Sequence, residues 1–294
     1  MKTAVIDIGG TVIKSGIFKD GKITEQRECP TNAQRGGPAV LETVADVIRG
    51  YETVEAVSIC TTGQIDTDRG MVKFAGPNIP NYQGLEIKKR LSEEFGLPVF
   101  VENDVNAAAL GEAHFGGGRE CADFLCLTYG TGIGGAIIRG GQVYHGVNFG
   151  AGEFGGIIVH PENQNKEDIF SGCYERYASV TALVALAKEA GLPVENGRDI
   201  CKRMGEPEVE EVLNAWINEV AFGLVTLIHI FDPQMLLLGG GIMEQTAITD
   251  RIQKAVRERI MESYRGVKIS PAQLGNQAGL YGMAYLAEKG LGVV

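Results

Sequence analysis

The chain has 294 residues, 44% hydrophobic and 22% charged, which is typical of a globular protein and enough for two domains. Its 27 basic and 37 acidic residues give a net charge of −10, which argues against a nucleic-acid partner because phosphate-binding surfaces need clustered Lys and Arg. The six cysteines form no C-x-C or C-x-x-C pair, and we expect a cytoplasmic protein with reduced thiols, no signal peptide and no membrane span.

The first part of the chain alternates between strands and helices. Strands are predicted at residues 3–7, 12–18, 23–28, 54–60 and 99–102, and helices at 38–50, 85–95 and 105–114. An Asp-Gly pair at 20–21 marks a hairpin turn between the second and third strands. These elements predict an α/β domain that opens with an antiparallel meander.

The second part repeats that opening. Strands are predicted at 124–128, 135–139 and 235–238, with another after the Gly-Gly turn at 140–141, and helices at 174–190, 208–231, 248–264 and 279–289. Residues 163–170 are polar and are expected to form a loop. The repeated order of strand, glycine-rich turn and strand suggests two domains of related design.

A first glycine-rich loop follows the first strand in the segment Asp-Ile-Gly-Gly-Thr-Val-Ile-Lys at 7–14. Gly9 and Gly10 allow backbone N–H groups to face phosphate oxygens, and Thr11 adds a hydroxyl. Asp7 can hold Mg²⁺ directly or through water. A plain hairpin is the structural alternative, but it would not need an Asp at the strand end followed by Gly-Gly-Thr.

A second loop, Gly-Thr-Gly-Ile-Gly-Gly at 130–135, matches the G-x-G-x-x-G pattern of dinucleotide-binding folds. That fold requires a helix directly afterwards, whereas residues 136–139 predict a strand, so we interpret Gly130, Thr131 and Gly132 as a phosphate clamp between strands. Gly240 and Gly241 follow another strand and predict a third point of close approach, suited to the adenosine part of a nucleotide.

Asn103 and Asp104 lie where an apolar strand ends and a helix begins. By itself, an Asp in this position is more often a helix cap. Between two phosphate loops, however, its carboxylate is suited to accept a proton from a substrate hydroxyl. Glu153 and Glu175 are further candidates as ligands of sugar hydroxyls, although isolated glutamates are usually solvated. The four histidines show no ligand spacing with Cys.

Taken together, these segments resemble the ROK family of bacterial sugar kinases and sugar-responsive repressors over nearly the whole chain. The resemblance is carried by the first loop with its Lys14, Thr-Gly-Gln-Ile-Asp at 62–66, Pro-Asn-Ile-Pro at 77–80, Glu-Asn-Asp-Val-Asn-Ala at 102–107, the second loop, Gly-Ala-Gly-Glu-Phe-Gly at 150–155, and Phe-Asp-Pro at 231–233 with Leu-Gly-Gly-Gly at 238–241. The order and number of these segments make the match specific.

The resemblance implies an α/β protein of actin-like ATPase (ribonuclease H-like) fold, with two domains around a central cleft. The expected domains are 1–110 with 277–294, and 111–276. It implies Asp104 as general base and contacts to the sugar from Gly63, Asn78, Asn103, Glu153 and Glu175. ATP would be bound by Asp7, Gly9, Gly10, Thr11, Lys14, Gly130, Thr131, Gly132, Gly240 and Gly241, with Mg²⁺ at Asp7, and a homodimer is expected.

Two departures from the family pattern concern zinc. Gly156 stands where the family has a His that touches both sugar and zinc, and only Cys173 remains of its Cys-rich zinc loop. One ligand cannot build a tetrahedral site, so we expect no zinc. The missing imidazole suits a bulkier substrate, such as a β-glucoside or an N-acetyl amino sugar, but also a plain hexose.

The sequence therefore predicts a kinase that transfers phosphate from ATP to a hexose or hexose derivative, with O6 of a glucose-type sugar as the favoured acceptor. Kinases for an N-acetyl amino sugar or a β-glucoside are the alternatives within this class, and a non-catalytic sugar sensor is the alternative outside it. A repressor would need a helix-turn-helix before Asp7, where six residues stand. A dehydrogenase would have to prefer NAD to ATP.

Overall fold

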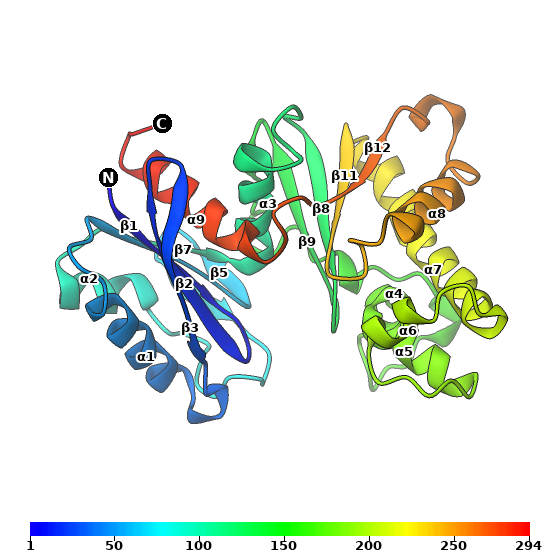
Figure 1. The fold of residues 1–294 in the computed structure, drawn as a ribbon, viewed down its shortest axis with the longest axis horizontal. Coiled ribbons are helices and arrows are strands. Elements are labelled where there is room, and N and C mark those ends of the chain that lie inside the picture. Colours follow the sequence, from blue (N-terminus) through cyan, green and yellow to red (C-terminus); the bar gives the residue numbers. More distant parts are fainter. The chain divides into compact units, whose positions relative to one another are not determined.

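The computed structural model describes residues 1–294, which divide into two compact units (Figure 1). The first contains residues 1–119, 141–151 and 276–294, and the second contains 120–140 and 152–275. The first unit thus includes 111–119 and 141–151, beyond the limits predicted from the sequence. Helix α3 (Asp104–Phe115) runs unbroken past residue 110, and the ring of His114 on it hydrogen-bonds to the carbonyl of Gly141.

The first unit is built on a five-stranded sheet of order β3-β2-β1-β4-β7. Its strands are β1 (Thr3–Ile8), β2 (Val12–Lys19), β3 (Lys22–Pro30), β4 (Ala56–Thr61) and β7 (Val99–Asn103). The first three form the predicted antiparallel meander, and β4 and β7 run parallel to β1. The carboxyl ends of β1, β4 and β7 therefore lie at one edge of the sheet, where the loops that follow them can meet.

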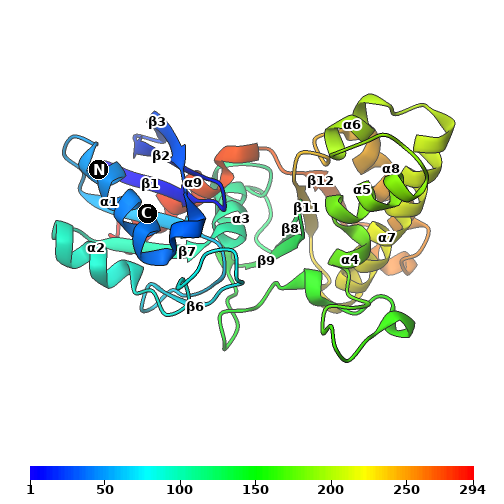
Figure 2. The ribbon, with the colours of Figure 1, turned by 90° about the horizontal axis from the view of Figure 1, so that it is seen from below.

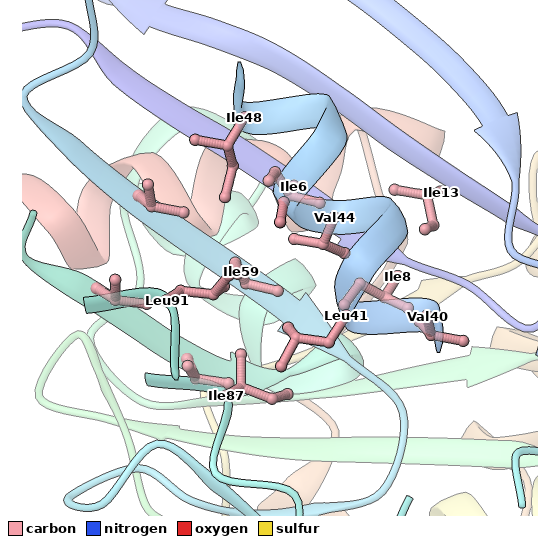
Figure 3. Close-up of a cluster of buried hydrophobic side chains, with 14 of the residues drawn as sticks. Ile6, Ile8, Ile13, Val40, Leu41, Val44, Ile48, Ile59, Ile87 and Leu91 are labelled. Carbon is pink, nitrogen blue, oxygen red and sulfur yellow. The ribbon is translucent and has the colours of Figure 1, made fainter. Parts of the chain in front are cut away.

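Two pairs of helices pack on opposite faces of this sheet. Alternate residues of β1 show this, since Ile6 belongs to the cluster with α1 (Gly37–Arg49) and α2 (Ile87–Phe95), whereas Val5 packs with α3 and α9 (Ala278–Gly290). The first cluster contains Ile59 from β4 and Leu91 from α2 and is almost fully buried (Figure 3). The predicted apolar spacing of both helices thus supplies the core.

Within the second unit the sheet strands follow the order β9-β8-β11-β12, whereas the two-residue strand β10 (Gln142–Val143) belongs to residues 141–151 of the first unit. The strands of the second unit are β8 (Phe124–Tyr129), β9 (Ile133–Arg139), β11 (Met235–Gly239) and β12 (Lys268–Pro271). Strand β9 is antiparallel to β8, while β11 and β12 run parallel to it. This repeats the order of the first sheet, as the duplicated sequence pattern suggested.

The helices of the second unit lie on the same side of β8, β11 and β12 in two perpendicular views (Figures 1 and 2). They are α4 (Glu175–Ala178), α5 (Val180–Glu189), α6 (Gly197–Lys202), α7 (Pro207–Phe231) and α8 (Thr246–Arg257). Helix α7 is long and apolar enough to cross a membrane by length and composition alone. Half of its most apolar stretch is buried within the protein, as expected for a core helix.

Some predicted elements were wrong in extent. The helix expected at 174–190 is broken at Ser179, whose backbone is extended and whose side chain accepts a hydrogen bond from the N–H of Ala182 to cap α5. The buried Trp216 ring donates to the carbonyls of Ala178 and Ser179 at this break. The helix expected at 248–264 ends at Arg257. The hairpin β5 (Gln64–Asp66) and β6 (Met71–Phe74), helix α6 and strand β12 were not predicted.

Five single-turn 3₁₀ helices complete the chain. They span Ala33–Arg35, Phe154–Gly156, Pro161–Asn163, Glu262–Tyr264 and Gly275–Gln277. The loop predicted at 163–170 contains no strand or α-helix.

Candidate active site

Two carboxylates lie near each other at the carboxyl edge of the first sheet. Asp7 is the fifth residue of β1 and pairs in register with Cys60 on β4, which pairs in turn with Glu102 on β7. Asp104 follows β7 as the first residue of α3. Burial raises the pKa of Asp104 to about 6, with a further contribution from the charge of Asp7. The edge therefore holds a carboxyl group whose pKa lies nearer to neutral pH than that of an ordinary Asp.

Asn103, and not Asp104, caps helix α3. Its side-chain oxygen accepts hydrogen bonds from the N–H groups of Val105 (2.9 Å) and Asn106 (3.0 Å). Asp104 is the next residue, and its Oδ1 accepts from Val105 N–H and from Asn103 Nδ2, both at 2.9 Å. The interpretation of Asp104 as the cap is therefore wrong. Because Oδ1 takes both bonds, the second oxygen of the carboxylate is left for other partners.

The amide of Asn103 also joins this turn to Gly63. Its Nδ2 donates to the Gly63 carbonyl at 3.0 Å. Gly63 has φ of 97°, and a Cβ there would lie 2.6 Å from the carbonyl oxygen of Phe74, so only glycine fits without strain. Asn78 lies in an exposed turn beside the buried Ile79. The structure thus brings Gly63, Asn103 and Asp104 together and leaves Asn78 on the surface.

The first glycine-rich loop is a short turn held by Thr31, the residue that follows β3. Gly9 N–H donates to the carbonyl of Val12 at 3.1 Å, and the hydroxyl of the buried Thr31 donates to the Gly9 carbonyl at 2.7 Å. A Cβ on Gly10 would meet no atom within 4 Å, so this position borders open space. Thr11 is exposed. The sequence pattern did not identify Thr31, because its hydrogen bond to Gly9 joins residues that are 22 positions apart.

The acidic end of β1 is balanced by a basic side chain on the neighbouring strand. Lys14 on β2 pairs in register with Asp7. Burial raises the pKa of Asp7, whereas a hydrogen bond with Cys60 and the charge of Lys14 oppose the shift. Asp7 thus offers a half-buried carboxylate oxygen next to the glycine turn.

The second unit presents a corresponding edge. Gly130, Thr131 and Gly132 follow β8, and the turn is closed by the Gly130 N–H, which donates to the Gly132 carbonyl at 3.0 Å. Strand β9 follows, so the dinucleotide-binding alternative fails its structural requirement. Gly240, after the adjacent parallel strand β11, has φ of 103° and packs so tightly on the Tyr129 carbonyl that no side chain fits. The two loops therefore lie at one edge.

The two predicted glutamates of the second unit interact with each other and with this loop. Glu175 begins α4, and a Cβ on Gly132 would lie 2.7 Å from its Oε2. The pKa of Glu153 is raised by partial desolvation and by the charge of Glu175, although its side chain is largely exposed. The structure therefore brings Glu175 against the phosphate loop, with Glu153 within electrostatic reach.

The segment that leads to Glu175 is tied down by a histidine. His160 contacts Glu162 through Nδ1 and Glu219 on α7 through Nε2, both at 2.8 Å. These hydrogen bonds raise the pKa of His160. Cys173 is buried and its backbone bridges to Ile158. The sequence pattern gave no signal for this clamp, because Glu219 is 59 residues away in the chain.

Comparison with known proteins identifies relatives along the whole chain. The sequence model described as the ROK family matches residues 3–290. A glucokinase of Streptomyces coelicolor is 33% identical over 98% of each sequence. A β-glucoside kinase of Klebsiella pneumoniae is 32% identical, covering 97% of this chain and 95% of the relative.

A solved structure extends the comparison to the fold. A ROK family glucokinase from Streptomyces griseus, in complex with glucose and AMPPNP, matches with a TM-score of 0.84 at 33% identity, covering 98% of this chain and 100% of that chain. The expected actin-like ATPase fold is thereby confirmed.

Proposed function

The chain belongs to the ROK family and is an ATP-dependent carbohydrate kinase, and on this premise we propose that it phosphorylates O6 of a glucose-type hexose with Asp104 as general base. The observation that carries the proposal is the pair of half-buried carboxylates with raised pKa, Asp7 and Asp104, at the edge of the first sheet beside a glycine turn. A kinase needs a base for the acceptor hydroxyl and a site for charged phosphates.

Each side chain has a defined part in the proposed reaction. Asp104 accepts the proton of the sugar hydroxyl as the hydroxyl oxygen attacks the γ-phosphorus of ATP, whose bond to the bridging oxygen breaks to release ADP. Asn103 orients the sugar and, as the helix cap, fixes the position of Asp104. Glu153 and Glu175 accept hydrogen bonds from other sugar hydroxyls.

The glycine turns supply the phosphate-binding part. A Cβ on Gly10 or on Gly130 would meet no atom within 4 Å, so both turns border open space in which phosphate oxygens would fit. Gly240 and Gly241 form the proposed adenosine side. The residues also fit a magnesium ion, because the half-buried carboxylate of Asp7 lies next to the first turn and Mg²⁺ prefers oxygen ligands. When bound there, Mg²⁺ would neutralise charge on the phosphates.

A β-glucoside is a second candidate acceptor. Gly156 lies three residues after Glu153, and a Cβ at this position would meet no atom within 4 Å. This open space would accommodate a substituent on the sugar. The β-glucoside kinase among the relatives points in the same direction.

A panel of sugars separates these candidates. We expect sugar-dependent ADP release with glucose or with β-glucosides, and ³¹P NMR of the product should show phosphate on O6. Comparison of kcat/KM between glucose and methyl β-glucoside would rank the two acceptors. Sugar binding in calorimetry without any ADP release would instead support the non-catalytic sensor.

The pH dependence of the reaction should reflect the ionisation of the Asp104 carboxyl group. Only its ionised form can accept a proton, so kcat/KM should fall by about tenfold per unit as pH drops below about 6. Steady-state rates at fixed magnesium and ATP across the acidic range would measure this limb. A midpoint near 4, the range of an ordinary carboxyl group, would contradict the role of Asp104 as a buried base.

The proposal also includes a cytoplasmic homodimer. Exposed apolar side chains on α7, including Phe222 and Ile230, offer a face for a second copy. Size-exclusion chromatography with light scattering would test the oligomeric state.

A further inference from the structure

A buried carboxylate that the proposed reaction does not use lies directly before Asn103 and Asp104. We call the junction of β7 and α3 formed by these two residues the catalytic turn. Glu102, on β7, has a side chain only 1% exposed. Its Oε1 accepts hydrogen bonds from the backbone N–H of Asn103 at 2.8 Å and from Nδ2 of Asn106 at 3.1 Å. Glu102 therefore holds both ends of the turn in which Asp104 lies.

The other oxygen of Glu102 is bound from a different segment. Nε2 of His145 lies 2.7 Å from Glu102 Oε2, and the ring N–H donates the hydrogen bond to this oxygen. His145 belongs to residues 141–151, which we call the strap. The strap lies in the first unit and continues in the chain to Glu153.

The strap has anchors besides His145. At its start, His114 Nε2 contacts the carbonyl of Gly141 at 3.0 Å, and the ring of His114 stacks on Tyr285 of α9. Further along, Lys73 of β6 contacts the side chain of Asn148. His145 differs from these anchors because its partner is the carboxylate that holds the catalytic turn.

We propose that His145 is a positioning residue for catalysis, acting on Asp104 through Glu102 and the backbone of Asn103. This inference rests on the proposed kinase function. Without the imidazole, the buried Oε2 loses its hydrogen-bond donor, and the Glu102 side chain can rotate to find another. The turn then loses its fixed support, and a displacement of the base by about 1 Å costs about 10²-fold in rate.

A second contact joins the strap to the segment that contains Gly63, a proposed ligand of the sugar. Gly150 lies against Gln64, the first residue of β5 and the neighbour of Gly63, since a Cβ on Gly150 would be 2.9 Å from Gln64 Nε2. Gly63 is in turn bound by Asn103. The strap thus contacts the catalytic turn through Glu102 and the substrate loop through Gln64, all within the first unit.

The test compares two substitutions of His145. H145A removes the donor and should lower kcat by about 10- to 100-fold, while KM for ATP changes by less than about threefold, because the ATP loops do not contact Glu102. H145Q places an amide donor near the position of Nε2 and should restore kcat to within about fivefold of wild type. Thermal unfolding of both variants and sugar binding by calorimetry show whether each is folded.

H114A is the matched control, because it releases the start of the strap without touching Glu102. We expect its kcat to stay within about threefold of wild type. Equal losses in H114A and H145A, equal losses in H145A and H145Q, or unchanged kcat in H145A would each overturn the inference. Failure of the kinase proposal is distinguished by the wild-type protein, which would then show no sugar-dependent ADP release.

Discussion

Replacing Asp104 by Asn is expected to lower kcat for sugar phosphorylation by about 10²- to 10⁴-fold. The amide keeps the size of the side chain, but it cannot accept the proton of the attacking hydroxyl. Sugar affinity should stay within about fivefold, because Asn103, Glu153 and Glu175 are the proposed ligands that remain. Coupled measurement of ADP release gives the rate, and calorimetry with the preferred sugar gives the affinity.

A stability measurement distinguishes loss of the catalytic base in D104N from unfolding of the variant. Burial raises the pKa of Asp104, so at pH above its folded pKa the folded protein carries an unfavourable buried charge. The contribution of Asp104 to folding stability is lost as pH rises from its pKa in the unfolded chain to its pKa of about 6 in the folded protein. D104N should therefore be at least as stable as wild type at pH 7.5. D20N, in an exposed hairpin turn, is the control and should keep full activity. Near-normal turnover in D104N would show that another group is the base.

Replacing Gly282 by Ala is expected to destabilise the first unit by about 2 kcal/mol. Helix α9 crosses α3 so closely that a Cβ on Gly282 would overlap the carbonyl oxygen of Ala107, and a Cβ on Gly111 would overlap that of Ala278. Both obstacles are backbone atoms, so the helices must separate. Separation costs about 3 kcal/mol, and the better helix propensity of Ala returns about 1.

Urea unfolding monitored by circular dichroism would measure the change in unfolding free energy from the shift of the denaturation midpoint. Catalysis should fall as well, because Gly279 on the same helix lies against Cys60, the partner of Asp7. Gly266 is a matched control, since a Cβ there meets no atom within 4 Å, and G266A should change stability by less than about 0.5 kcal/mol. A Gly282→Ala variant as stable as wild type would show that α3 and α9 can separate without cost.

The sequence was most informative where local chemistry decides the structure. The Asp-Gly pair at 20–21 predicted its hairpin, and the apolar spacing of residues 38–50 predicted α1, because each depends on neighbouring residues alone. Residues 174–190 look like one helix for the same reason. The break at Ser179 depends on hydrogen bonds from Trp216, which is far away in the sequence.

In the candidate site, too, motifs predicted some residues and only the fold identified others. Gly63 and Asn103 were predicted from motifs, and the structure joins them by a hydrogen bond. Glu102 lies in the segment that predicted Asp104, but the sequence did not assign Glu102 a role of its own. Its role depends on burial and on a hydrogen bond with His145, which is 43 residues away. Single histidines give no pattern in a sequence, and only the fold shows which of them face a carboxylate.

Gly156 illustrates how such a site can change over evolution. Since a Cβ here would meet no atom within 4 Å, a small side chain can be accepted without rearrangement of the surrounding chain. A codon change of this kind therefore alters what lies beside Glu153 more than it alters the fold. Paralogues arising from gene duplication could exchange one acceptor sugar for another through such a step, long before the rest of the protein diverges.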